Sequence, residues 1–166
     1  RGLSLERMQH PLFRKQCEQV NREMVENHYN HPSIIIWGIL NECASNTEQG
    51  REIYQEQLEQ IRALDQSRPL TFASHHLAAE LSFDLVDIVS FNLYPQWYTD
   101  EDPSDLADQA RKWADESGGA GKPMIMSEFG ADGLYGYRCS TAVKGTEERQ
   151  AMIIEANLAA YMKKDY

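Results

Sequence analysis

The chain has 166 residues, of which 42% are hydrophobic, and this is enough apolar material for the core of one globular domain. Its formal charge of −10, from 26 acidic against 16 basic residues, repels the phosphates of nucleic acids and the surfaces of anionic membranes. No stretch approaches the ~20 consecutive apolar residues that a membrane-spanning helix needs. We therefore expect a protein that binds neither nucleic acid nor membrane.

The cysteines are the next constraint. Cys17, Cys43 and Cys139 form no CxxC pair, and one of them would be left over in any disulfide scheme. We interpret all three as free thiols. This favours a reducing compartment, and the cytoplasm is the expected location.

The first predicted elements are a helix and a buried strand. The run of residues 34–40 is apolar or small throughout, which is typical of a strand buried on both faces in a parallel sheet. This run leads directly into Asn41 and Glu42. Before it, apolar residues recur at the spacing of a helix with one buried stripe: Phe13, Cys17, Val20 and Met24.

The rest of the chain alternates between strands and helices. Further strands are expected to begin near Leu70, Val86 and Met124, with room for only a short helix between the first two. Longer helices are expected over residues 51–65, 105–117 and 147–165. Their inward-facing residues are predicted to be Tyr54, Leu58, Ile61, Leu106, Ala110, Trp113, Ile154, Leu158 and Tyr161.

This order predicts an α/β fold with four parallel strands, beginning near residues 34, 70, 86 and 124. Such strands fit either a small doubly wound sheet or half of a (β/α)₈ barrel, and length alone does not separate the two. A nucleotide-binding doubly wound enzyme is disfavoured because no G-x-G-x-x-G follows any strand, and in the segment GGAGKP a proline replaces the Ser or Thr of a phosphate loop.

Two of the predicted strands end in a glutamate. Glu42 closes the segment WGILNE and Glu128 lies in MSEFG, so both carboxylates should emerge at the same edge of a parallel sheet. Paired carboxylates about 5 to 5.5 Å apart suit a retaining glycosidase, in which one is the nucleophile and the other the acid/base. The alternative is that both are solvated loop residues, because the surface is the usual place of glutamate.

Three segments of the chain resemble the motifs of a known enzyme family. NHPSIIIWGILNE, FNLYPQWY and KPMIMSEFGADGLYG resemble the catalytic-barrel motifs of glycoside hydrolase family 2, in order and in spacing. They are more similar to the β-glucuronidases than to the large β-galactosidases. The resemblance implies the C-terminal half of a (β/α)₈ TIM barrel, with residues 1–166 forming part of one catalytic domain from about strand four to helix seven. On this basis we expect the chain to be an excised fragment.

The resemblance also implies roles for individual residues. Glu42 matches the general acid/base, and the neighbouring Asn41 matches the residue that binds the sugar 2-hydroxyl. Glu128 matches the nucleophile that forms the glycosyl-enzyme intermediate. Tyr94, in NLY, matches a tyrosine whose hydroxyl contacts that nucleophile. The reaction of the family retains the anomeric configuration and needs no redox cofactor.

The aromatic segment after the third strand is expected to bind substrate. Tyr98 matches a tyrosine that helps hold the substrate carboxylate in glucuronidases, and Trp97 is expected to form a wall of the pocket. Pro95 is a departure, because glucuronidases usually carry a second tyrosine there. His75 and His76 end the second strand; we expect His75 to line the sugar pocket, and no metal site, since adjacent residues of an extended chain point to opposite sides.

These observations predict a retaining β-glycosidase that acts on β-glucuronides. The alternative is a β-galactosidase or a related family 2 enzyme, and a further alternative is a carbohydrate-binding fragment without activity. An open sheet of four strands leaves two unpaired edges, so we also expect the chain to associate, for instance as a pair of half-barrels; the alternative is a marginally stable open layer.

Overall fold

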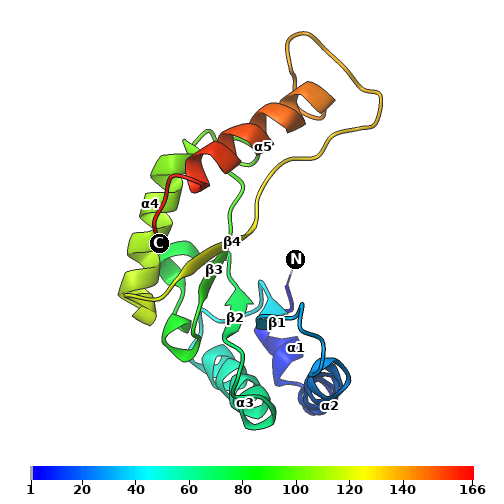
Figure 1. Cartoon of the computed structure of the whole chain (residues 1–166), viewed down its shortest axis with the longest axis vertical. Helices are drawn as coiled ribbons and strands as arrows, with labels where there is room; N and C mark the ends of the chain where they lie inside the picture. The colour runs from blue at the N-terminus through cyan, green and yellow to red at the C-terminus, as the bar shows by residue number, and fades with distance from the viewer. Residues whose placement is uncertain (1) are drawn as a thin grey trace.

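The computed structural model describes residues 2–166, in which strands alternate with helices (Figure 1). The strands are β1 (Trp37–Asn41), β2 (Leu70–Ala73), β3 (Val89–Asn92) and β4 (Met124–Glu128). The α-helices are α1 (Leu5–Gln9), α2 (Pro11–His28), α3 (Glu48–Leu64), α4 (Pro103–Ala114) and α5 (Glu147–Tyr161). Short helical turns are η1 (Leu77–Ala79), η2 (Phe83–Leu85) and η3 (Asp115–Gly119).

The four strands run parallel and lie side by side in chain order. β1 pairs with β2, and β3 pairs with β4. The two pairs are joined by a parallel bridge between Ser74 and Phe91, where the Ser74 amide donates to the Ser90 carbonyl at 3.0 Å. The helices cover one side of this strand layer, with α1 to α3 at one end and α4 and α5 at the other (Figure 1). This arrangement is the wall expected for half of a barrel.

The hydrophobic core lies between the strands and the helices. Its centre is a row of aromatic rings, in which Phe72 contacts Tyr54 at 4.7 Å and Phe83 at 5.4 Å between ring centroids. Phe83 in turn lies 5.0 Å from Phe91. Because Tyr54 comes from α3, Phe72 from β2 and Phe91 from β3, this row fixes the helical layer on the strands.

Two predicted strand starts are wrong by three residues. β1 begins at Trp37 instead of Ile34, because the Ile34 amide donates to the His31 carbonyl in a turn and Ile35 is 69% exposed. The strand also alternates between buried and exposed residues and is not buried on both faces. β3 begins at Val89 instead of Val86, because Val89 is the first residue in register with β4.

The predicted inner faces of two helices also need correction. In α2, Val20 is 60% exposed, whereas Asn21 and Val25 are buried. In α5, Ile154 and Leu158 are exposed, the latter by 45%, and the buried positions are Ile153 and Asn157. The physical reason is that asparagines occupy inward positions of both helices. Asn21 does so by donating to the Gln57 side chain at 3.2 Å, and Asn157 by donating to the Ile153 carbonyl at 2.8 Å.

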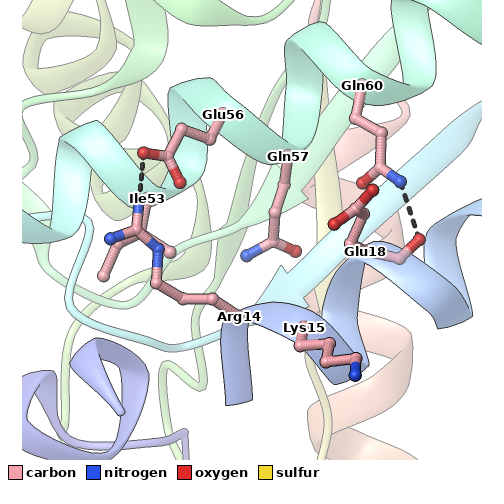
Figure 2. Close-up of a pocket in the computed structure, with 7 residues that line it drawn as sticks. All are labelled: Arg14, Lys15, Glu18, Ile53, Glu56, Gln57 and Gln60. Carbon is pink, nitrogen blue, oxygen red and sulfur yellow. Dashed lines mark hydrogen bonds and ion pairs between the residues drawn. The ribbon is translucent and has the colours of Figure 1, made fainter. Parts of the chain in front are cut away.

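A crevice of about 400 Å³ separates α2 from α3 on the helical side of the molecule. Figure 2 shows Gln57 of α3 projecting into it, between the ion pair of Arg14 with Glu56 and the bond from Gln60 Nε2 to the Glu18 carbonyl. The crevice is lined by helix residues alone, so it is separate from the ends of the strands.

The amino end of β1 is held by a buried carboxylate. Asp65 accepts hydrogen bonds from Trp37 Nε1 at 2.8 Å, from the Ser67 hydroxyl at 2.6 Å and from Arg68 Nη1 at 2.6 Å. Arg68 Nε also donates to the Ile34 carbonyl at 2.8 Å. Burial disfavours the charge on Asp65, but the hydrogen bonds from Ser67, Trp37 and Arg68 outweigh it and hold the pKa of this carboxyl well below its usual range.

No helix within residues 2–166 has both the length and the apolar composition to cross a membrane. All three cysteines are free thiols, as expected.

Candidate active site

Each of the two predicted catalytic glutamates follows an irregularity in its strand. In β1 the pairing with β2 skips Leu40, and in β4 the pairing with β3 skips Ser127. Such bulges bend a strand and change the direction of the next side chain. Glu42 and Glu128 therefore leave the wall at the carboxyl ends of β1 and β4, one or two residues beyond the bulge.

The backbone around Glu42 is strained. Leu40 and Glu42 have positive φ angles of 27° and 54°, which residues with a side chain rarely adopt. The Glu42 amide donates to the Ala73 carbonyl of β2 at 3.0 Å and holds this conformation. Gly2 lies so close that a Cβ on it would be 1.8 Å from the Glu42 carbonyl oxygen, so glycine is required at that position.

A cleft of about 630 Å³ opens at the carboxyl ends of the strands. It brings together five of the predicted site residues: Glu42, His75, Tyr94, Tyr98 and Glu128. The remaining lining residues are Leu77, Asn92, Leu93, Thr99, Glu101 and Leu106. Asn41 and Trp97 are the two predicted residues that do not line this cleft.

Tyr94 holds one oxygen of Glu128. Its hydroxyl donates to Glu128 Oε2 at 2.5 Å. Burial raises the pKa of the Tyr94 hydroxyl, and so do the hydrogen bond to Glu128 and the negative charges of Glu128 and Glu42. The proton therefore stays on the phenol, and Glu128 accepts at Oε2 while Oε1 is left for other partners.

Asn92 holds the other glutamate, and it is the residue that the sequence prediction missed. Its Nδ2 donates to Glu42 Oε1 at 3.0 Å and to Asn41 Oδ1 at 2.9 Å. Asn92 is the last residue of β3 and is buried. The signal was present in the sequence, because Asn92 ends a buried strand as Asn41 does and precedes Tyr94 by two residues.

Asn41 is exposed beside this cleft. Because its Oδ1 accepts from Asn92, its amide nitrogen is the group that could donate to a sugar hydroxyl.

Of the aromatic residues after β3, Tyr98 lies at the rim of the cleft and Trp97 lies beside it. Tyr98 is 72% exposed, and its ring packs edge-on against Tyr94 at 5.3 Å between centroids. Trp97 is covered by Lys144, whose ammonium lies 4.2 Å from the centre of the indole ring and donates to the Trp97 carbonyl at 2.7 Å. Lys144 lies in the segment between β4 and α5, so this contact joins that segment to the loop after β3.

The two histidines differ from the predicted geometry. The rings of His75 and His76 are neighbours, 4.3 Å apart between centroids, and do not point to opposite sides. The reason is that β2 ends at Ala73 and His76 has helical dihedral angles of −81° and −1°. His76 Nε2 lies 2.6 Å from the Cys43 carbonyl and supports the loop after β1, whereas His75 is exposed in the cleft wall.

The remaining candidate groups at this site are metal ligands and a thiol. Within residues 2–166, no group of three His, Cys, Asp or Glu side chains is placed to hold a metal ion. Cys43 is buried, and burial raises the pKa of its thiol. A thiol in that state is a weak nucleophile.

Comparisons with known proteins identify the family. Residues 4–164 match the family described as "Glycosyl hydrolases family 2, TIM barrel domain". The human protein named beta-glucuronidase is 33% identical over 143 residues, which cover 82% of this chain and 22% of that protein.

Solved structures agree in fold. A GH2 beta-galacturonidase from Eisenbergiella tayi bound to galacturonate superposes with a TM-score of 0.96 and 46% identity, over 99% of this chain and 30% of that one. The beta-D-glucuronidase of Dictyoglomus thermophilum superposes with a TM-score of 0.82 and 30% identity, over 92% of this chain and 27% of that one. The chain thus spans less than a third of the length of these relatives. It belongs to glycoside hydrolase family 2 and forms part of the TIM-barrel domain of that family.

Proposed function

We propose that the protein carrying this chain hydrolyses β-glycosides with retention of configuration, with Glu128 as nucleophile and Glu42 as acid/base. The observation that carries the proposal is that both glutamates line one cleft and that each is held through a single oxygen by a residue at the end of β3 or just after it. The other oxygen of each carboxylate is then available for chemistry. Residues 1–166 would be part of one catalytic domain, from about strand four to helix seven of the barrel.

In the first step, Glu128 attacks the anomeric carbon and forms the glycosyl-enzyme ester. The bond between that carbon and the glycosidic oxygen breaks, its electron pair stays on the oxygen, and Glu42 supplies the proton. In the second step, Glu42 takes a proton from water as the water attacks the anomeric carbon, and Glu128 leaves as a carboxylate. Because Tyr94 occupies Oε2 of Glu128, Oε1 is the attacking atom.

The substrate class we propose is a β-uronide, and a β-glucuronide in the first place. The relatives with this name support it, and Tyr98 at the rim of the cleft is the residue proposed to hold the C6 carboxylate. A β-galacturonide is the second candidate, because the chain is 46% identical to a beta-galacturonidase over 99% of its length. The β-galactoside alternative differs by lacking the carboxylate.

A panel of nitrophenyl glycosides tests the reaction and the substrate together. We expect the protein that carries this chain to hydrolyse a β-uronide faster, in kcat/KM, than the matching neutral glycoside, because a site that hydrogen-bonds a substrate group discriminates against an analogue that lacks this group. The anomer released first, followed by NMR, should be β. Release of the α anomer, or a preference for neutral glycosides, would contradict the proposal.

The variant Glu128→Gln should lose at least ~10⁴-fold in kcat/KM, since it removes the nucleophile while it keeps the shape of the side chain. Tyr137→Phe, on the exposed segment after β4, is the control and should keep the activity of the parent protein. Ordinary turnover by Glu128→Gln would show that the nucleophile lies elsewhere.

The rival function is carbohydrate binding without hydrolysis. It predicts that the sugar binds, as seen by calorimetry, while no product appears even after long incubation with a nitrophenyl uronide. Product formation that depends on Glu128 excludes it.

Self-association and a cytoplasmic location remain predictions. Association is supported by the apolar residues that α5 exposes, among them Met152 and Leu158. Sedimentation velocity at several concentrations tests it, and a monomer at every concentration would contradict it. Cell fractionation tests the location.

A further inference from the structure

Ser127 is the residue at the bulge of β4 that has no pairing partner in β3. It contacts the side chain of Asn92. The Ser127 hydroxyl donates to Asn92 Oδ1 at 2.6 Å and also lies 3.0 Å from the Phe91 carbonyl. It accepts from the Ser90 hydroxyl at 2.7 Å. The bulge therefore does more than turn Glu128 toward the cleft: it places a hydroxyl against the neighbouring strand.

These contacts fix which way the Asn92 amide faces. Its oxygen meets the hydroxyl of Ser127, and its nitrogen meets two acceptors, the Asn41 amide oxygen and Oε1 of the Glu42 carboxylate. Turning the amide over would place oxygen against two acceptors. Because Asn92 is only 3% exposed, water cannot easily compensate for such a mismatch.

The fixed amide has a consequence for the proton on Glu42. A donor at Oε1 disfavours a proton on that oxygen, so the proton of the acid form resides on Oε2. The hydrogen bond from Asn92 also strengthens when Glu42 becomes a carboxylate, because a charged acceptor binds a donor more strongly than a neutral one. Glu42 becomes a carboxylate as it gives its proton to the leaving oxygen.

We propose that Asn92, locked by Ser127, is a positioning residue that directs the proton of Glu42 to Oε2 and stabilises the carboxylate that forms when this proton is delivered. This inference rests on the proposed function, since it assigns Asn92 a role in the acid step. It joins the two glutamates physically: Ser127 immediately precedes Glu128, and through Asn92 it reaches Glu42 on the other side of the cleft.

The test measures kcat/KM for aryl glycosides of the preferred sugar, with leaving groups from phenol to 2,4-dinitrophenol. A dinitrophenolate leaves without a proton, whereas a phenolate needs one. For Asn92→Ala we expect a ~10- to 100-fold loss on the phenyl glycoside and a change within about threefold on the dinitrophenyl glycoside, because acid catalysis is worth up to about 10⁴-fold only where the leaving group needs it. Ser127→Ala should show the same pattern with a loss of several-fold.

The matched control is Asn157→Ala on α5. Asn157 is also a buried asparagine with both ends of its amide engaged, by the Ile153 carbonyl and the Tyr161 hydroxyl. A purely structural defect should lower the rate equally for all leaving groups, and this is the pattern expected for Asn157→Ala. The same uniform pattern for Asn92→Ala would overturn the proposal.

Two further variants keep the result interpretable. If Asn92→Ala does not fold, Asn92→Asp carries the test, because it keeps the size of the side chain and replaces the donor by an oxygen; we expect at least an equal leaving-group dependence, and a uniform loss would overturn the proposal. Glu42→Ala is the reference for the acid step. If it shows no leaving-group dependence, the assigned role of Glu42 fails; if it does and Asn92 variants do not, only the positioning role fails.

Discussion

At the amino ends of the strands, Asp65 is buried and accepts hydrogen bonds on both of its oxygens. At the carboxyl ends, by contrast, Asn92 donates to Oε1 of Glu42 and Tyr94 donates to Oε2 of Glu128. A carboxylate with every oxygen engaged has nothing left for a substrate, and it holds its surroundings in place. A carboxylate with one oxygen engaged is oriented and still has a reactive atom. The comparison predicts that damage to Asp65 lowers stability and that damage near the glutamates lowers activity.

The change with the largest expected effect on stability is Asp65→Ala. It leaves the Trp37 nitrogen and the Arg68 guanidinium without their buried acceptor, which should lower the free energy of unfolding by about 3 to 5 kcal/mol. Urea unfolding measures the loss. Asp108→Ala is the control, since Asp108 is an exposed carboxylate paired with Lys164 and its removal should lower the free energy of unfolding much less. Equal losses for the two variants would contradict the special role of Asp65.

Tyr94→Phe, at the carboxyl ends of the strands, should lower activity and leave stability nearly unchanged. It removes the hydroxyl that donates to Glu128 and keeps the ring that packs on Tyr98. We expect kcat/KM to fall by about 10- to 100-fold, because a hydrogen bond to a charged group contributes about 1.5 to 3 kcal/mol. The unfolding midpoint should move little. A large loss of stability with normal turnover would show that the tyrosine is structural.

The pH dependence of the free energy of unfolding tests the role of Asp65 at the amino ends of the strands. The pKa of Asp65 is lowered in the folded protein, so its contribution to stability is fully present above about pH 4, the ordinary range of aspartate. It is lost as the pH falls below that range toward the lowered folded value. Between pH 5 and 2, stability of the parent protein should therefore fall more steeply than that of Asp65→Asn, by up to about 1.4 kcal/mol per pH unit. Parallel curves would contradict the assignment.

The smallest expected effect is that of Tyr98→Phe. Tyr98 is exposed at the rim of the cleft, so a hydrogen bond from it to a substrate carboxylate forms in partial contact with water. We expect an increase in KM of about fivefold for a uronide and no change for the neutral glycoside. An equal change for both substrates would remove Tyr98 from carboxylate recognition.

Much of the fold could be predicted from local patterns. Short apolar segments predict the alternation of strands and helices, and the position of Glu42 and Glu128 at the ends of two such segments predicts that both reach the cleft. The inner faces of α2 and α5 could not be predicted in this way, because Asn21 and Asn157 occupy inward positions that periodicity assigns to apolar residues. Their burial depends on partners, and a partner on another helix, such as Gln57 for Asn21, cannot be read from spacing.

The details of the site could be predicted only in part. The bulges at Leu40 and Ser127 depend on how one strand registers with its neighbour, and no local pattern in either strand contains that information. Asn92 was missed for a related reason, since its importance comes from reaching across from β3 to β1. The candidate catalytic residues can be predicted from the sequence, but the register between neighbouring strands determines which of them contact one another.

The most direct test of the account is to trap the glycosyl-enzyme intermediate. A 2-fluoro glycosyl fluoride of the preferred sugar should inactivate the protein that carries this chain, and mass spectrometry of its peptides should place the sugar on Glu128. Glu128→Gln should take up no label. A label on Glu42 or on any other residue would contradict the assignment of Glu128 as the nucleophile.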